Sequence, residues 1–250
     1  MAPDAESCTA RAAVPSIDGS LGARLLPAAL SLTAGSVDAI SFLGFGGLFA
    51  AHITGNLVIM AAHIVTGGSA RPAGILSVPV FIGVLGLTRG LAAGLESLRV
   101  STLRPLLTLQ FVLLAAALVL CVTAGSPLDT EGPTAVFAGM LAVSAMAVQN
   151  TLVQVSLEGA PATAVMTTNI TRFVADIGTI MLGPESPEIA RARNRAWHTG
   201  QAILGFAAGC ALGAAYEAGF AMISLLLPTG VALLSVVLGL SIGFGRGKHR

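Results

Sequence analysis

The stretch SVDAISFLGFGGLFAAHITGNLVIMAAH, residues 36–63, places a carboxylate, a glycine-rich break and a polar triplet inside an apolar run. Asp38 has no Lys or Arg close to it, and Thr54-Gly55-Asn56 opens a second, shorter apolar segment. A helix that begins inside a bilayer leaves about four backbone N–H groups without partners, and Thr and Asn commonly cap such ends. The stretch therefore predicts a spanning helix followed by a short helix that starts at membrane depth.

The composition is that of a membrane protein. Of the 250 residues, 54% are hydrophobic and 10% are charged, whereas soluble domains carry about 25% charged residues. The formal net charge of +1 gives no reason to expect nucleic acid as a partner. The three cysteines have neither a disulfide framework nor metal-ligand spacing, so we expect no metal and no cofactor. The lipid bilayer is the expected environment.

Apolar segments of up to about 25 residues follow a polar N-terminal region, and the longer ones suffice to cross the hydrocarbon core. Strands are not expected, because the runs are long and lack alternation. Residues 1–23 predict a disordered cytoplasmic tail, 24–245 a single membrane domain, and 246–250 a basic cytoplasmic end. The eight segments are 24–46, 54–66, 73–95, 103–124, 134–157, 168–182, 197–218 and 220–244.

The two short segments occupy matching places in an internal repeat. Asn56 follows Asp38 by 18 residues, and Asn169 follows Asn150 by 19 residues. Each asparagine ends a polar triplet that opens a short apolar segment. The predicted repeats are 24–124 and 134–244.

The distribution of charges decides between two topologies. If all eight segments cross, Arg99 and Arg104 fall outside while Asp129 and Glu131 fall inside, which reverses the positive-inside rule. If the two short segments dip in and return, the order is correct and only Arg71 is misplaced. We therefore predict an all-α polytopic membrane helix bundle of about six spanning helices plus two short re-entrant helices, a 3+3 inverted repeat. Eight spanning helices in a 4+4 parallel repeat are the alternative.

Polar and charged residues at membrane depth are the candidate site. A carboxylate there costs about 2.5–3.5 kcal/mol, so Asp38 either binds a proton or cation, pairs with Arg172, or tethers the re-entrant loop by accepting backbone N–H groups. Arg172 and Asp176 are four residues apart and can pair, either facing substrate or as a neutralised pair near the cytoplasmic interface. The substrate- or ion-binding candidates are Asp38, Thr54, Gly55, Asn56, Gln149, Asn150, Thr168, Asn169, Arg172 and Asp176. His52 either relays protons or is a hydrogen-bonded loop histidine.

Residues 35–39 (GSVDA) and 52–56 (HITGN) resemble the signature of the YoaK-like family, bacterial inner-membrane proteins that form a domain of unknown function. Residues 147–150 (AVQN) resemble its second-half element, with Ala where Gly is usual, and 167–169 (TTN) stand where that family tends to have T-G-T or T-G-N. The resemblance covers most of residues 25–245. It implies a multi-spanning inner-membrane protein and no established substrate.

These features favour a secondary transporter or permease for a small polar or anionic solute, with N- and C-termini in the cytoplasm. The alternative is a non-transporting membrane scaffold or accessory protein, for which residues 205–213 give small-xxx-small spacing. A homo-oligomer is left open. Enzymatic activity is not predicted, because the sequence shows no nucleophile set and no metal-ligand set.

Overall fold

The fold is all-helical. A computed structural model of the chain describes residues 21–67, 71–125, 129–157, 159–184 and 186–242, and no strand occurs among them. The predicted tail, apart from residues 21–23, and the predicted basic end 246–250 lie outside the described residues. The helices are α1 (Leu21–Gly44), α2 (Ile53–Thr66), α3 (Pro72–Ser97), α4 (Leu103–Ala124), α5 (Pro133–Ser156), α6 (Met166–Leu182), α7 (Pro187–Phe220), the 3-10 helix η1 (Ala221–Leu225) and α8 (Leu226–Ser241).

Six of these helices are long and apolar enough to cross a membrane: α1, α3, α4, α5, α7 and α8 with the end of η1. The other two are shorter. α2 has 14 residues and α6 has 17, so they reach about 21 and 26 Å against a hydrocarbon core of about 30 Å. The predicted polytopic bundle, with six long and two short helices, is confirmed.

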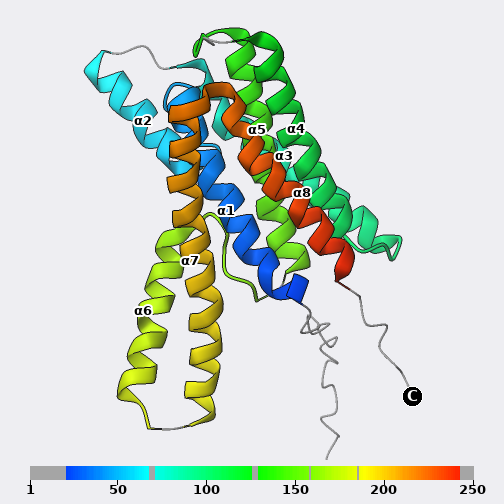
Figure 1. Ribbon diagram of the computed structural model, residues 1–250, viewed down its shortest axis with the longest axis vertical. Helices are drawn as coiled ribbons and strands as arrows, with labels where there is room; N and C mark the ends of the chain where they lie inside the picture. The colour runs from blue at the N-terminus through cyan, green and yellow to red at the C-terminus, as the bar shows by residue number, and fades with distance from the viewer. Residues whose placement is uncertain (1–20, 68–70, 126–128, 158, 185, 243–250) are drawn as a thin grey trace, which may run out of the picture.

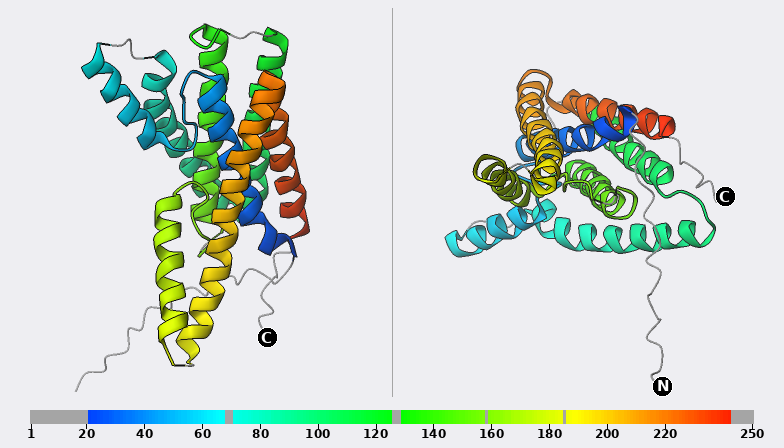
Figure 2. Two further views of the ribbon diagram at one scale, coloured as in Figure 1. Left: turned by 60° about the vertical axis from the view of Figure 1, so that its left-hand side comes forward. Right: turned by 90° about the horizontal axis from the view of Figure 1, so that it is seen from below.

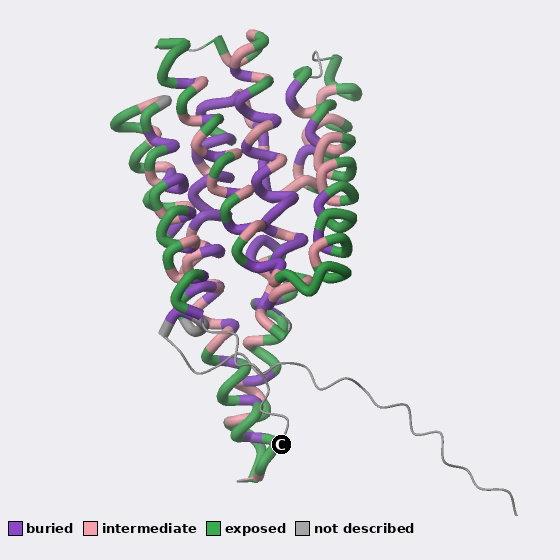
Figure 3. The backbone as a smooth tube through the Cα atoms, turned by 90° about the vertical axis from the view of Figure 1, so that its right-hand side faces the viewer, coloured by how far each residue is buried: buried purple, intermediate pink, exposed green. Residues whose placement is uncertain are grey.

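Helices α1 and α5 lie at the centre of the bundle (Figure 1). α1 packs against α7 and α8, and α5 packs correspondingly against α3 and α4. The short helices follow the same scheme, because α2 packs on α3 and α6 packs on α7. In the view of Figure 1, α1 runs upward and α5 runs downward. Figure 2 shows the same arrangement from two further sides, and Figure 3 shows the buried residues gathered between the helices.

Glycines set the closest helix contact, which joins α1 to α7. A Cβ added to Gly209 would lie 2.3 Å from the carbonyl oxygen of Leu32, and one added to Gly35 would lie 2.2 Å from that of Phe206. Gly213 meets the backbone of α1 in the same way, one turn further along. The small-residue spacing in residues 205–213 is thus used inside the chain, where it lets two backbones touch.

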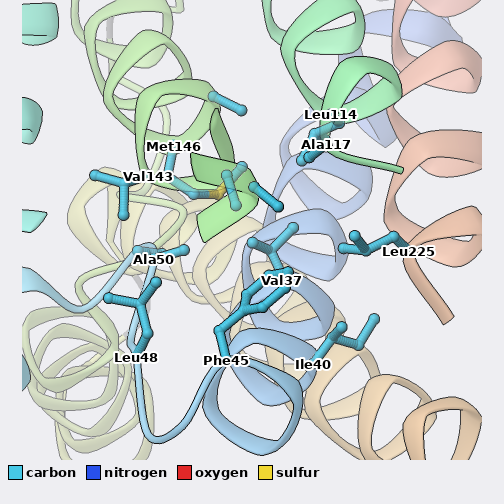
Figure 4. Close-up of a cluster of buried hydrophobic side chains, with 14 of the residues drawn as sticks. Val37, Ile40, Phe45, Leu48, Ala50, Leu114, Ala117, Val143, Met146 and Leu225 are labelled. Atoms are coloured by element: carbon cyan, nitrogen blue, oxygen red, sulfur yellow. The ribbon is translucent and has the colours of Figure 1, made fainter. Parts of the chain in front are cut away.

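The loop between α1 and α2 is built into the core. Phe45 and Leu48, at its start, are each 2% exposed. They belong to the cluster drawn in Figure 4, which also contains Val143 and Met146 of α5. A loop anchored by buried side chains has a defined path, and this path brings the start of α2 into the interior of the bundle.

Arg71 shows that the chain leaves α1 and enters α3 at the same end of the bundle. Its guanidinium donates a hydrogen bond to the carbonyl oxygen of Gly46, just after α1, although Arg71 itself precedes α3. Gly46 and Gly47 both have positive φ, so the turn requires glycine. α2 begins partway along the bundle, packed on α3, and returns to the end at which α1 finished (Figure 1). Arg71 also pairs with Glu131, at 3.6 Å.

Candidate functional site

A cavity of about 360 Å³ lies between the start of α2 and the start of α6. Two threonines, Thr54 and Thr167, line it from the first turns of these helices. Asn150 and Gln154 line it from α5, and the remaining polar residue is His52, directly before α2. The cavity thus receives hydrogen-bonding groups from both halves of the chain.

Both helices begin at this cavity without a side-chain cap. The N-cap residues are His52 for α2 and Val165 for α6, and neither makes a capping hydrogen bond through its side chain. Neither helix has an acidic residue in its first turn. The first N–H groups of a helix have no acceptor within it, and they carry the positive end of its dipole. The two helix starts can therefore hold an anionic or strongly polar group.

Asp38 tethers the loop that leads to α2. Its Oδ1 accepts a hydrogen bond from the backbone N–H of Ala51, at 2.6 Å, and its Oδ2 contacts Nδ1 of His52. The Asp38 side chain is 5% exposed. The suggested pairing of Asp38 with Arg172 is not formed, because His52 of the adjoining loop contacts Oδ2 of Asp38, whereas Arg172 is exposed on α6. Of the three interpretations of Asp38, the loop tether is the one that the contacts show.

The loop before α6 is held by a neutral amide, that of Gln149, and not by a carboxylate. Gln149 of α5 donates to the carbonyl oxygen of Leu30 at 3.0 Å and to the Oγ1 of Thr163 at 2.8 Å, in the loop before α6. Its Oε1 accepts from Nε2 of Gln110 on α4, at 2.6 Å. The neighbouring Asn150 instead donates to a carbonyl one turn earlier in α5, at 2.9 Å, and lines the cavity. Gln149 therefore holds the loop, and Asn150 faces the candidate site.

The two asparagines of the polar triplets hold the loops rather than line the cavity. Nδ2 of Asn56 donates to the carbonyl oxygen of Phe49 at 2.7 Å, and Nδ2 of Asn169 donates to that of Ala162 at 2.6 Å, seven residues back in each case. Asn56 also accepts from the N–H of Phe49 at 2.9 Å and donates to Ser77 at 2.9 Å. Both asparagines are buried and neither is among the lining residues of the cavity.

The remaining residues of the two polar triplets have different roles: some line the cavity and others do not. Thr54 is exposed at the cavity. Gly55 serves packing, since a Cβ there would lie 2.8 Å from the ring of Phe49. Thr168 is exposed but does not line the cavity, whereas Thr167 does.

Asp176 pairs with Arg195 of α7, not with Arg172. Nη2 of Arg195 lies 2.6 Å from Oδ1 of Asp176, and its Nε donates to the same carboxylate at 3.2 Å. This forked contact satisfies the carboxylate better than an arginine one turn earlier on the same helix, where the order Arg before Asp is the weaker one. Arg172 and Asp176 line a separate cavity of about 410 Å³ between α6 and α7, together with His198.

Of the polar residues that line the cavity, Gln154 and Thr167 are absent from the predicted binding residues, and His52 is predicted either as a proton relay or as a hydrogen-bonded loop histidine. A signal for Gln154 was present, because it follows Asn150 by four residues and so lies on the same face of α5. Gln110, a lone amide in the apolar run of α4, was a comparable signal for the buried network around Gln149.

The fold and the cavity define the class: an all-helical polytopic membrane bundle with a cavity between two helix starts, lined by five polar and seven apolar residues. Residues 26–238 match the family described as "Protein of unknown function (DUF1275)", and the chain belongs to that family. The match runs from α1 into α8 and thus includes both halves. Neither a curated protein nor a solved structure matches the chain. Membership in a domain of unknown function is confirmed, and the designation YoaK-like stays a prediction.

Proposed function

We propose that the protein is a secondary transporter for a small polar or anionic solute, acting in the bacterial inner membrane with both termini in the cytoplasm. The observation that carries the proposal is the cavity of about 360 Å³ between the starts of α2 and α6. Pockets that bind small molecules have volumes of about 300–1,000 Å³ and a few convergent polar groups. Thr54, Asn150, Gln154 and Thr167 supply such groups.

The helix pairings support a 3+3 inverted repeat as part of the proposal. The contact of α1 with α7 corresponds to the contact of α5 with α3. In the same way, the contact of α1 with α8 corresponds to the contact of α5 with α4. α1 and α5 run in opposite directions (Figure 1). Inverted repeats whose short helices start near the membrane midplane are typical of transporters that work by alternating access. In such a mechanism the cavity opens first to one side of the membrane and then to the other.

The chemistry of the cavity favours a solute with a carboxylate, a phosphate or several hydroxyl groups. Two helix N-termini face the cavity, and no carboxylate lines it. The side chains of Thr54, Asn150, Gln154 and Thr167 are neutral and can both donate and accept hydrogen bonds. His52 is the titratable residue among the lining residues.

The scaffold alternative has lost its supporting feature. Gly205, Gly209 and Gly213 all lie against the backbone or side chains of α1, so they present no free face to a partner helix. We propose a permease rather than an enzyme.

Cysteine accessibility tests the proposal. In a variant without Cys8, Cys121 and Cys210, single cysteines Thr54→Cys and Thr167→Cys are treated with an impermeant methanethiosulfonate in spheroplasts and in inverted vesicles. We expect each cysteine to react from both sides, because alternating access exposes the cavity to both. Preincubation with small carboxylates, inorganic phosphate or polyols should slow the reaction for the compound that binds. That compound should then be taken up by proteoliposomes that contain the purified protein.

Two control variants show which result of the accessibility experiment would contradict the transporter proposal. Leu204→Cys, on an apolar side chain 71% exposed on α7, should stay unmodified in lipid, and Ser97→Cys, at the end of α3, should react from one side only. If Thr54→Cys and Thr167→Cys react from neither side while Ser97→Cys reacts, the cavity has no access to water and the transporter proposal is wrong.

A further inference from the structure

We propose that Asp38 and His52 together bind a proton, and that this proton strengthens the binding of an anionic solute in the cavity. The inference rests on the proposed function and adds the ion to which solute binding is coupled. It starts from the contact between Oδ2 of Asp38 and Nδ1 of His52, at the edge of the cavity.

The two members of the pair differ in their access to the cavity. The carboxylate of Asp38 is 5% exposed, and both of its oxygens are used, one by His52 and one by the N–H of Ala51. The imidazole of His52 is 35% exposed and lines the cavity. Its ring also packs edge-on against Phe206 of α7, with the centroids 5.4 Å apart. Because Nδ1 is directed at Asp38, Nε2 is the nitrogen that can exchange a proton with water in the cavity.

Few other charges act on this pair. Cys210, on α7, is the further titratable group whose interaction with Asp38 is evident. The residues that α2, α3, α5 and α6 contribute to the cavity wall are all neutral. The ion pair that Asp38 makes within the described residues is the one with His52. The net charge of the site therefore depends on the proton of a single imidazole.

Protonation changes the field at the start of α2. With a neutral imidazole the pair carries a net charge of about −1, and with an imidazolium it carries about zero. His52 is the N-cap residue of α2, so the added positive charge lies beside the helix N-terminus that faces the cavity. A cation placed there adds to the attraction of an anion and opposes that of a cation. By linkage, a bound anion must strengthen proton binding by the same factor.

The proposed coupling step transfers one proton and no other group. One proton passes from water to Nε2 of His52 on the side from which the anion enters, and it returns to water on the other side. No covalent bond to the solute forms or breaks. The anion and its proton together add about zero charge to the site, so loading does not increase the net charge that must be closed off from water in a low-dielectric interior.

Two cysteine reagents of opposite charge test the coupling without knowledge of the natural solute. Thr54→Cys, in the variant without native cysteines, reacts with a sulfonate-bearing and with a trimethylammonium-bearing methanethiosulfonate. The ratio of the two rates cancels the ionisation of the cysteine itself. We expect the ratio of the anionic to the cationic rate to fall about tenfold as the pH rises through the pKa of His52, because the imidazole then loses its positive charge. The hydrogen bond to Asp38 raises the pKa of His52 above the ordinary histidine value, so the fall should be centred above that value.

Substitutions show which histidine is responsible. His52→Asn in the same background should give a ratio that does not change with pH, whereas His63→Asn, in the last turn of α2 and away from the cavity, should leave the pH dependence intact. Asp38→Asn keeps an acceptor for the N–H of Ala51 but removes the counter-charge, so it should shift the midpoint to lower pH. This second variant preserves the test if His52→Asn does not fold.

Three results would overturn the inference: a flat ratio in the parent variant, an unchanged pH dependence in His52→Asn, or an unchanged midpoint in Asp38→Asn. Each of these can occur while Thr54→Cys still reacts from both sides of the membrane. In that case the transporter proposal stands and only the proton coupling is wrong. If Thr54→Cys reacts from neither side, both are wrong.

Discussion

The two loops that return the chain to the interior are held by different chemistry. The loop before α2 is held by the carboxylate of Asp38, which engages Ala51 and the imidazole of His52. The loop before α6 is held by the amide of Gln149, which engages Thr163. A buried carboxylate needs a counter-charge, while a buried amide needs only hydrogen-bond partners. Both loops are thus held by a buried polar side chain, and the acid–imidazole pair is found at the loop before α2.

The largest effect is expected from a comparison of the α1–α7 contact with the outer surface of α3. Gly209→Ala places a Cβ within 2.3 Å of the Leu32 carbonyl, so the helices must separate. We expect the free energy of unfolding in detergent to fall by about 3 kcal/mol. Gly86→Ala in α3 has nothing within 4 Å and should be neutral, or stabilising by up to about 1 kcal/mol. Equal effects of the two substitutions would contradict the glycine contact.

A smaller effect on the free energy of unfolding is expected from a comparison of Asn56 with Asn169. Asn56→Ala removes three hydrogen bonds and leaves both backbone groups of Phe49 without this partner, so it should lower the free energy of unfolding by about 2–3 kcal/mol. Asn169→Ala removes one short hydrogen bond, to Ala162, and the Oδ1 of Asn169 has no partner to lose. Its cost should be about 1 kcal/mol. Thermal unfolding of the two purified variants measures the difference, and a larger cost at Asn169 would reverse the comparison.

The smallest effect on the free energy of unfolding is expected from a comparison of two ion pairs, Arg71–Glu131 and Arg195–Asp176. Glu131 is 59% exposed and 3.6 Å from Arg71, so Glu131→Gln should change the free energy of unfolding by less than about 0.5 kcal/mol. Asp176 is 9% exposed and receives a forked contact from Arg195, so Asp176→Asn should cost about 1 kcal/mol. High salt should weaken the first pair more than the second. Unfolding measured at low and at high salt would show whether the order holds.

The pattern of long and short helices could be read from the sequence because hydrocarbon thickness sets helix length. The glycines around Gly46 and the Thr54-Gly55-Asn56 triplet marked where one helix ends and a short one starts, and the structure has both features there. Backbone groups at membrane depth must be capped or paired wherever a helix is interrupted. That requirement is local, so it leaves a local signal in the sequence.

The direction of individual side chains could not be read in the same way. Gln149 and Asn150 are neighbours, and successive residues on a helix point about 100° apart, so one faces the loop and the other the cavity. A repeat aligned by spacing alone does not distinguish them. The partner of Asp176 likewise depends on how α6 packs on α7, because Arg195 lies 19 residues further along the chain. Such pairs are properties of tertiary packing.

The glycine contact between α1 and α7 has a mechanical consequence. α1 comes from the first half of the chain and α7 from the second, yet their backbones touch. α3 and α5 also pack on one another across the halves, but without such a contact, because a Cβ added to any glycine of α3 would have no atom within 4 Å. The long helices therefore form two groups, α1 with α7 and α8, and α5 with α3 and α4, and each group combines helices from both halves of the chain. Any opening of the cavity would bend the α1–α2 loop and the α5–α6 loop. Each of these loops connects one group of helices to the other, because α2 packs on α3 and α6 packs on α7.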